Sequence, residues 1–150
     1  MNYAFRSRLI CLGIAGSLLL ACGSALAINT RSESAPHGTR LGQEFKLRAG
    51  QQVTVKGTRL RIKFVKVEND SRCPTGVTCV WAGNAAVRLW VSTGRGGNTL
   101  TLNTNKGPSL ADEAQYRGYK LKLVGLSPYP RSGRKIVAGS YRATLLVSKE

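Results

Sequence analysis

The chain has 150 residues, with 23 Lys and Arg against seven Asp and Glu, and a formal net charge of +16 at pH 7. This length fits one domain. So large a positive charge favours solubility and attraction to anionic surfaces but indicates no particular fold. The acidic residues form no obvious pair, so the sequence does not indicate general acid–base catalysis by two carboxylates.

Residues 1–27 have the features of an export signal. Arg6 and Arg8 give a positive start, an apolar stretch too short to span a membrane runs to Cys22, and residues 25–27 (Ala-Leu-Ala) form a small-x-small cleavage site. We therefore predict a periplasmic or secreted protein. Removing this leader takes away two basic residues and no acidic one, which leaves 21 basic and seven acidic residues and a net charge of +14.

A second interpretation of the leader predicts a lipoprotein. The residues Leu-Leu-Ala-Cys at 19–22 match a bacterial lipobox, in which Cys22 becomes the first residue and carries a lipid. The protein would then be tethered to a membrane, whereas cleavage after Ala27 would leave it free. The site at residues 25–27 is the cleaner match. Both cleavages remove Cys11, and both place the protein in an oxidising compartment.

Residues 28–40 are polar and show no periodic pattern, which is typical of a flexible linker. The chain's single histidine, His37, lies in this segment between a proline and a glycine. We expect no catalytic role for it, because nothing in the sequence gives it a fixed partner.

From residue 41 the apolar residues alternate with polar ones, as in β-strands, and no helix of any length is indicated. Segments 45–47 and 53–55 flank a turn at residues 49–50 and predict a hairpin. In segment 60–67 the apolar residues change face after Phe64, which predicts a β-bulge.

Residues 69–84 contain the only two cysteines beyond the leader, Cys73 and Cys79. A disulfide between them would close a short loop and contribute ~2–2.5 kcal/mol in the chain-entropy model. A zinc site would need four ligands, which two cysteines and the distant His37 do not supply. Redox dithiols usually have the closer Cys-x-x-Cys spacing. We predict a structural disulfide, and we expect Trp81, two residues after Cys79, to cover it.

The rest of the chain continues the same alternation. The expected strands are at residues 85–91, 100–102, 119–123 and 141–147, with turns and loops at residues 93–98, 103–115 and 127–133. Seven or eight short strands joined by Gly/Pro turns predict an all-β fold, a single antiparallel β-sandwich or partly open barrel spanning residues 41–150 with one disulfide loop.

The sequence around the cysteines resembles a signature of small exported proteins and lipoproteins of Gram-negative bacteria. It consists of Asn-Asp-Ser-Arg-Cys-Pro at residues 69–74 and Val-x-Cys-Val-Trp-Ala-Gly at residues 77–83. The resemblance covers most of the chain after about residue 41, but only the loop motif is specific. It implies an exported location and a disulfide. It implies no activity, because those proteins are uncharacterised.

No group of residues indicates an enzyme. Asp112 and Glu113 are adjacent, as in a solvated loop or at a helix start, and there is no free Cys, placed His or Gly-x-Ser-x-Gly turn for acyl transfer. Residues 94–97 (Gly-Arg-Gly-Gly) fit a hairpin turn better than a phosphate-binding loop, because no helix follows them. We expect a non-enzymatic protein with no cofactor and no metal.

Basic residues on the predicted strands are the main candidates for binding. Arg61, Lys63, Lys120, Lys122 and Arg142 alternate with apolar residues, and we expect the first four to form one patch if their strands share a sheet. The alternative is a cationic surface with no defined patch. The expected partners are an anionic envelope polymer, such as lipopolysaccharide or peptidoglycan, or an envelope protein. Specific nucleic-acid recognition is not expected, since there is no recognition helix and no paired aromatic platform.

Two aromatic residues are further candidates. Trp90, together with Arg88, falls on the face opposite the apolar residues of its strand and could contact a sugar or a protein. Tyr129 lies between two prolines, on a stiff loop suited to contacting a partner. Alternatively, a neighbouring loop or second sheet covers Trp90, and Tyr129 only anchors its own loop.

These features predict an exported, strongly basic, non-enzymatic and monomeric binding module of the bacterial cell envelope. The alternative is an inhibitor of an extracellular or periplasmic hydrolase that acts through its loops. Small exported β-sandwich inhibitors of cysteine proteases, the chagasin type, present a Gly-x-Gly-Gly loop, and residues 94–97 are similar to it. The two other inhibitory loops of that type are absent from this sequence.

Overall fold

The computed structural model describes residues 38–150. The predicted signal peptide (1–27), the possible lipid-bearing Cys22, His37 and most of the predicted linker lie outside the described residues. Within residues 38–150, no helix has both the length and the apolar character needed to cross a membrane.

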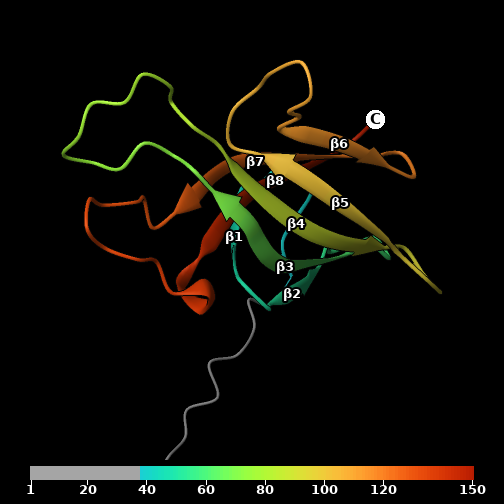
Figure 1. The fold of residues 1–150 in the computed structure, drawn as a ribbon. Helices are drawn as coiled ribbons and strands as arrows, with labels where there is room; N and C mark the ends of the chain where they lie inside the picture. The colour runs from blue at the N-terminus through green and yellow to red at the C-terminus, as the bar shows by residue number, and fades with distance from the viewer. Residues whose placement is uncertain (1–37) are drawn as a thin grey trace, which may run out of the picture. The chain divides into compact units, whose positions relative to one another are not determined.

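Eight strands form two antiparallel sheets of four strands each, and the sheets do not close into a barrel. One sheet has the order β1-β8-β7-β6, with bounds β1 Phe45–Arg48, β8 Arg142–Lys149, β7 Tyr119–Ser127 and β6 Glu113–Tyr116. The other has the order β2-β3-β4-β5, with bounds β2 Gln52–Thr54, β3 Arg61–Asp70, β4 Ala85–Ser92 and β5 Asn98–Asn103. A short 3-10 helix, η1 (Ala138–Ser140), precedes β8 (Figure 1). The predicted antiparallel β-sandwich is confirmed.

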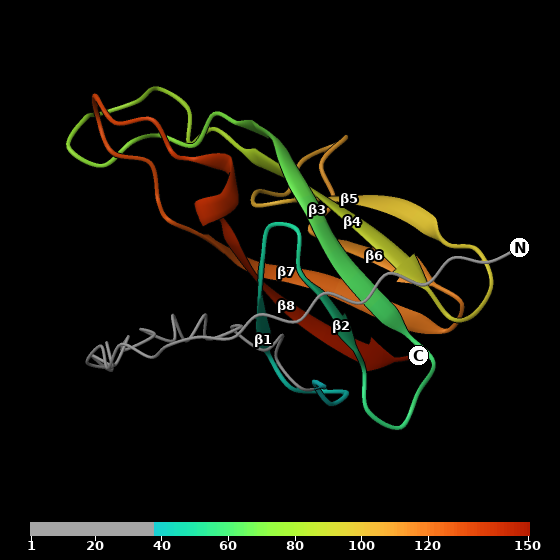
Figure 2. The ribbon, with the colours of Figure 1, turned by 90° about the horizontal axis from the view of Figure 1, so that it is seen from below.

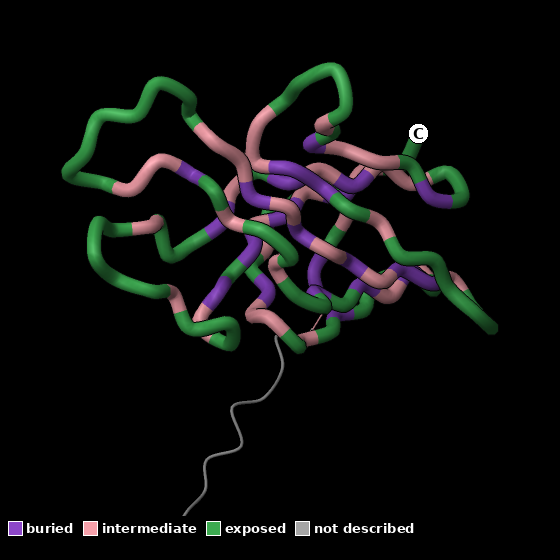
Figure 3. The backbone as a smooth tube through the Cα atoms, viewed as in Figure 1, coloured by how far each residue is buried: buried purple, intermediate pink, exposed green. Residues whose placement is uncertain are grey.

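The core is formed by alternate residues that the two sheets turn toward each other. Ile62 and Phe64 from β3 and Leu121 and Leu145 from β7 and β8 are fully buried. Figure 3 shows the buried residues along the strands and the exposed ones mainly in the loops. Because strand side chains alternate, the polar residues between these core positions face outward from each sheet.

The predicted bulge is confirmed, and the predicted hairpin is wrong. The pairing of β3 with β4 shifts register between Phe64 and Lys66, where the apolar residues change face. The turn between β1 and β2 crosses from one sheet to the other instead of joining paired strands: Ala49 N donates to Tyr141 O at 3.0 Å, and Gly50 N donates to Phe64 O at 2.7 Å.

The folded domain and strand β6 both begin at other residues than the sequence predicts. Thr39, in the predicted linker, is buried and forms a parallel bridge with Val55, so the described fold already includes this residue. Strand β6 begins at Glu113, inside the segment expected to be a loop. It pairs with β7 from Glu113–Lys122 to Tyr116–Tyr119, and this strand is the fourth of the β1-β8-β7-β6 sheet.

The long loops lie at one end of the sandwich. The disulfide loop (residues 71–84) joins β3 to β4, and the proline loop (residues 128–141) joins β7 to β8. Figures 1 and 2 show the two loops side by side, away from the turn at residues 93–97 that joins β4 to β5. The two long loops can therefore present one combined surface, whereas the 93–97 turn cannot contribute to it.

Candidate binding surface

The structure separates the predicted binding residues into three groups. Arg61, Lys63, Arg88 and Trp90 lie on β3 and β4 in one sheet, and Lys120, Lys122 and Arg142 lie on β7 and β8 in the other. Tyr129 lies in the proline loop. The prediction that Arg61, Lys63, Lys120 and Lys122 form a single patch is therefore wrong. The outward residues of two stacked sheets occupy opposite faces of the molecule. Alternation predicted their outward direction, but it could not show that their strands belong to different sheets.

The outer face of the β2-β3-β4-β5 sheet brings four predicted residues together around Trp90. Lys63 on β3 is the direct cross-strand partner of Trp90 on β4, and Arg61 pairs with Ser92 two residues along. Arg88 lies two residues before Trp90 and shares its face, because Leu89 between them is fully buried. We call these four residues the tryptophan face. Direct cross-strand neighbours lie within side-chain contact distance of one another.

The Trp90 indole is held in place by its neighbours. The Arg61 guanidinium lies 5.7 Å from the ring centroid, in a cation–π contact. Arg61 Nη2 also donates to Gly94 O at 2.8 Å, which fixes the guanidinium against the 93–97 turn. On another side, a Cβ on Gly97 would come within 2.6 Å of the indole, so only glycine fits there without moving the ring. Arg61 is therefore a positioning residue for Trp90.

A shallow depression of about 480 Å³ lies beside Trp90. Its lining combines two cations, an amide, a hydroxyl and apolar surface, provided by Lys63, Arg88, Gln52, Thr99, Val65 and Trp90. Arg88 Nη2 contacts Glu68 Oε1 at 2.8 Å, while its buried Nε has no hydrogen-bond partner. Within residues 38–150, no ion pair involves Lys63, whose side chain is exposed. An anion here would meet an unpaired ammonium group beside a flat aromatic surface.

The outer face of the β1-β8-β7-β6 sheet is also basic but has a different composition. Lys120 Nζ lies 3.4 Å from Glu113 Oε1, so part of the charge is already paired. Lys122 is the cross-strand neighbour of Leu146. Arg142 is exposed and donates to Ser140 O at 3.1 Å. The outward positions on β7 and β8 carry lysine, arginine, threonine, leucine and serine, together with the exposed Val124 at the register shift, and no aromatic ring. This face offers charge without the stacking surface that Trp90 provides.

The predicted Cys73–Cys79 disulfide is present, with the two Cα atoms 5.9 Å apart. Trp81 does not cover it: the tryptophan is 82% exposed. The expected alternation required residues 79–81 to continue a strand, but β4 begins only at Ala85. The chain bends at Gly83, which has φ +68° and lies so close to the Ser71 carbonyl that any side chain would clash.

Sequence reasoning missed a buried ion pair beneath the disulfide loop. The Arg72 guanidinium donates to the Asp70 carboxylate from Nε at 2.8 Å and from Nη2 at 2.6 Å. It also donates to the carbonyls of Leu126 (2.6 Å) and Pro128 (3.0 Å). The Tyr141 hydroxyl donates to Asp70 Oδ2 at 2.9 Å. The only signal of this pair in the sequence is that Asp70 and Arg72 both belong to the Asn-Asp-Ser-Arg-Cys-Pro motif.

Two pKa values are shifted in this network. Burial raises the pKa of the Asp70 carboxyl, but the hydrogen bonds from Arg72 and Tyr141 and the Arg72 charge outweigh it, so the pKa is lower than its ordinary value. Burial raises the pKa of Tyr141 to about 12, and its bond to the Asp70 carboxylate adds to the effect. At neutral pH, Asp70 is therefore ionised and Tyr141 is a neutral hydrogen-bond donor.

Tyr129, the last predicted binding residue, lies over this network. The Arg72 guanidinium carbon is 5.0 Å from the centroid of its ring, and the tyrosine remains 51% exposed. It thus anchors its loop and still presents surface to solvent. The 93–97 turn, which prompted the comparison with protease inhibitors, lies at the other end of the sandwich and does not join Tyr129 (Figure 1).

Residues 38–150 contain no group of three His, Cys, Asp or Glu side chains that could hold a metal ion. Comparison of the chain with protein-family models, with curated proteins and with solved structures found no match. The resemblance to small exported Gram-negative proteins therefore stays a prediction.

Proposed function

We propose that the protein is an exported, non-enzymatic binding module of the bacterial cell envelope, and that it holds an anionic polymer on the tryptophan face. The observation that carries this proposal is the depression beside Trp90, where Lys63 and Arg88 flank the indole. Acidic polysaccharides combine anionic groups with sugar rings. Lys63 and Arg88 would attract the anionic groups, the indole would stack on a ring, and Gln52 and Thr99 would hydrogen-bond to hydroxyls.

The high net charge and the site have separate roles in this proposal. The charge of the whole chain draws anionic polymers toward the protein from any direction and depends strongly on salt. The depression beside Trp90 supplies a short-range contact that salt screens less. Both sheets are basic on their outer faces, but only the tryptophan face adds an aromatic ring and a depression, so we place the polymer there.

Two matched charge reversals test this placement. Lys63→Glu and Lys122→Glu each change the charge by two at an outward position within a strand, and neither lysine forms an ion pair among the described residues. Both variants should fold, since Lys63 is exposed and Lys122 is only half-buried, and substitutions at surface positions usually change stability by less than about 0.5 kcal/mol. We expect Lys63→Glu to weaken binding to heparin or lipopolysaccharide about tenfold and Lys122→Glu to weaken it about twofold, measured at fixed salt.

A substitution of the indole separates stacking from charge. Trp90→Ala leaves the net charge unchanged, so we expect weaker binding with the same dependence on salt concentration. Equal loss of affinity in Lys63→Glu and Lys122→Glu, together with unchanged affinity in Trp90→Ala, would mean that diffuse attraction explains all binding. The tryptophan face would then have no special role.

A further inference from the structure

The end of the sandwich that carries the two long loops exposes apolar side chains that the tryptophan face does not explain. Val80 is 89% exposed, Trp81 82% and Val137 74%, with Val77 and Tyr129 each about half exposed. Of the large apolar side chains exposed among residues 38–150, all but two belong to these loops. Figure 3 shows both loops as largely exposed. Apolar groups gathered on one surface of a soluble protein commonly mark a binding site.

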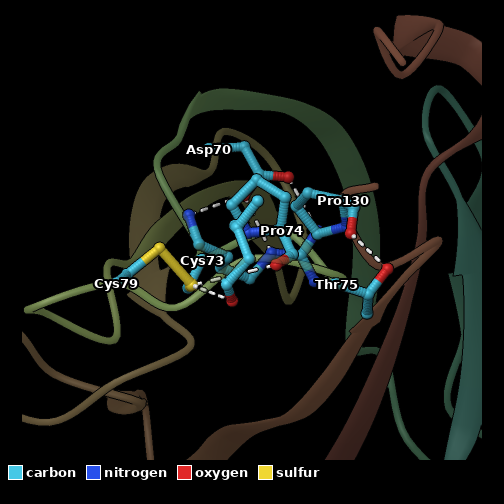
Figure 4. Close-up of a disulfide and its surroundings, with 8 residues drawn as sticks. Asp70, Cys73, Pro74, Thr75, Cys79 and Pro130 are labelled. Atoms are coloured by element: carbon cyan, nitrogen blue, oxygen red, sulfur yellow. Dashed lines mark hydrogen bonds and ion pairs between the residues drawn. A yellow bond between two sulfur atoms is a disulfide. The ribbon is translucent and has the colours of Figure 1, made fainter. Parts of the chain in front are cut away.

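The two loops are fixed to each other and to the fold. The Cys73–Cys79 disulfide closes the first loop, and Thr75 N donates to Pro130 O at 2.9 Å, which joins it to the second (Figure 4). Below the loops, Arg72 binds the carbonyls of Leu126 and Pro128. The exposed apolar side chains are thus presented on a preorganised support, which reduces the entropy lost on binding.

The charge of the loops indicates the chemistry of the partner. Residues 71–84 and 128–141 contain no acidic residue, and the proline loop carries the exposed Arg131, Arg134 and Lys135. These three side chains line a depression of about 720 Å³ together with Tyr129 and Val137. Cations beside an exposed valine and tyrosine, at the same end of the sandwich as the exposed Trp81, match a surface that is anionic outside and apolar just beneath.

We propose that the two loops together form a docking surface for an anionic phospholipid bilayer. Trp81 and Val80 would enter the boundary between headgroups and acyl chains, where tryptophan is favoured. Arg131, Arg134 and Lys135 would contact the lipid phosphates, which attract basic residues near a membrane. Because this surface is formed by other residues than the tryptophan face, the inference does not depend on the proposed polymer binding.

The first experiment uses protein purified from the periplasm with Cys22→Ser, so that no lipid can be attached to that residue. Vesicles of phosphatidylcholine with 30% phosphatidylglycerol are compared with vesicles of phosphatidylcholine alone in a co-sedimentation assay. We expect binding to the anionic vesicles and at least about tenfold weaker binding to the neutral ones. The double variant Val80→Ser/Trp81→Ser should lose about tenfold in affinity for the anionic vesicles without a change in charge.

A second readout reports insertion directly. In a Trp90→Phe background, Trp81 is the only tryptophan, and its emission should move to shorter wavelength with anionic vesicles and be quenched by brominated acyl chains. Arg131→Glu/Arg134→Glu should weaken vesicle binding, whereas Lys122→Glu, within strand β7 and outside both loops, should change it little. The melting temperature of each variant checks that the fold is intact.

Three outcomes would overturn the proposal. The first is failure to bind anionic vesicles. The second is binding without a Trp81 shift and without loss in the Val80→Ser/Trp81→Ser variant, which would indicate adsorption through the basic faces. The third is absence of vesicle binding while the same double substitution abolishes capture of an envelope protein, which would assign the loops to a protein partner.

Discussion

Arg72 binds Asp70, two residues earlier in the chain, through two hydrogen bonds of 2.8 and 2.6 Å, one to each carboxylate oxygen, and both side chains are more than nine-tenths buried. The remaining donors of the guanidinium reach the carbonyls of Leu126 and Pro128. Asp70 ends a strand of one sheet, whereas Leu126 lies in β7 of the other. A single side chain thus joins the two sheets and supports the disulfide and proline loops.

Removing this side chain should destabilise the protein strongly. Arg72→Ala leaves the Asp70 carboxylate buried with Tyr141 as its remaining side-chain donor, and breaking a buried pair in this way costs about 3–5 kcal/mol. Arg72→Lys should recover only part of the loss, because an ammonium cannot form the two-point contact. Urea unfolding at pH 7 measures both variants. A loss below about 1 kcal/mol for Arg72→Ala would contradict the supporting role given to this residue.

The raised pKa of Tyr141 predicts a specific loss of stability at high pH. The folded state holds the phenol proton up to a pKa of about 12, against an ordinary value of 10.0. The stabilisation is therefore complete below pH 10 and is lost as the pH rises from about 10 to 12. Tyr141→Phe lacks this titration, so the difference in unfolding free energy between wild type and variant should shrink across that range. A constant difference from pH 9 to pH 11.5 would show that Tyr141 is not coupled to Asp70.

The disulfide should stabilise the fold chiefly by restricting the unfolded chain. Replacing Cys73 and Cys79 together by serine should reduce the unfolding free energy by about 2–3 kcal/mol. The substitutions should leave the β-sheet circular dichroism spectrum unchanged, because the core contains neither cysteine. An unchanged midpoint in urea would contradict the prediction, and non-reducing mass spectrometry of the wild-type protein gives the required control.

Gly97 should be needed for the position of Trp90. A Cβ at residue 97 would lie 2.5 Å from Val91 O and 2.6 Å from the indole, so Gly97→Ala must displace the ring or the turn. We expect a changed emission maximum and weaker binding to heparin. Gly94→Ala is a matched control in the same turn, because no atom lies within 4 Å of its added Cβ. Equal effects of the two variants would mean that the turn, and not the contact with Trp90, is responsible.

The sequence predicted side-chain direction well and strand neighbours poorly. Alternation placed Ile62 and Leu121 in the core and Lys63 and Lys120 outside, because the pleat makes direction a local property. Whether Lys63 and Lys120 share a face depends on which strands pair, and pairing is set by contacts far apart in the chain. The turn after β1 shows the same limit, since Gly50 bonds to Phe64 in the other sheet instead of closing a hairpin.

Of the candidate site, the sequence predicts which side chains point outward but not which of them lie together. Trp90, Arg88, Lys63 and Arg61 were each assigned to an outer face, and the pairing of β3 with β4 brings them together. The Arg72 network was not predictable, because Tyr141 is 71 positions from Asp70 and no local pattern links them. Trp81 was misplaced because alternation was extended through a loop that bends at Gly83.

Binding of an anionic polymer on the tryptophan face can be tested residue by residue with one measurement. Amide and indole NMR resonances are followed while a short heparin oligosaccharide is added at physiological salt. We expect the largest shifts at the Trp90 indole N–H and at the backbone amides of Lys63, Arg88 and Thr99, with small shifts around Lys120 and Lys122. Equal shifts on both outer faces, or the largest shifts on the β7–β8 face, would contradict it.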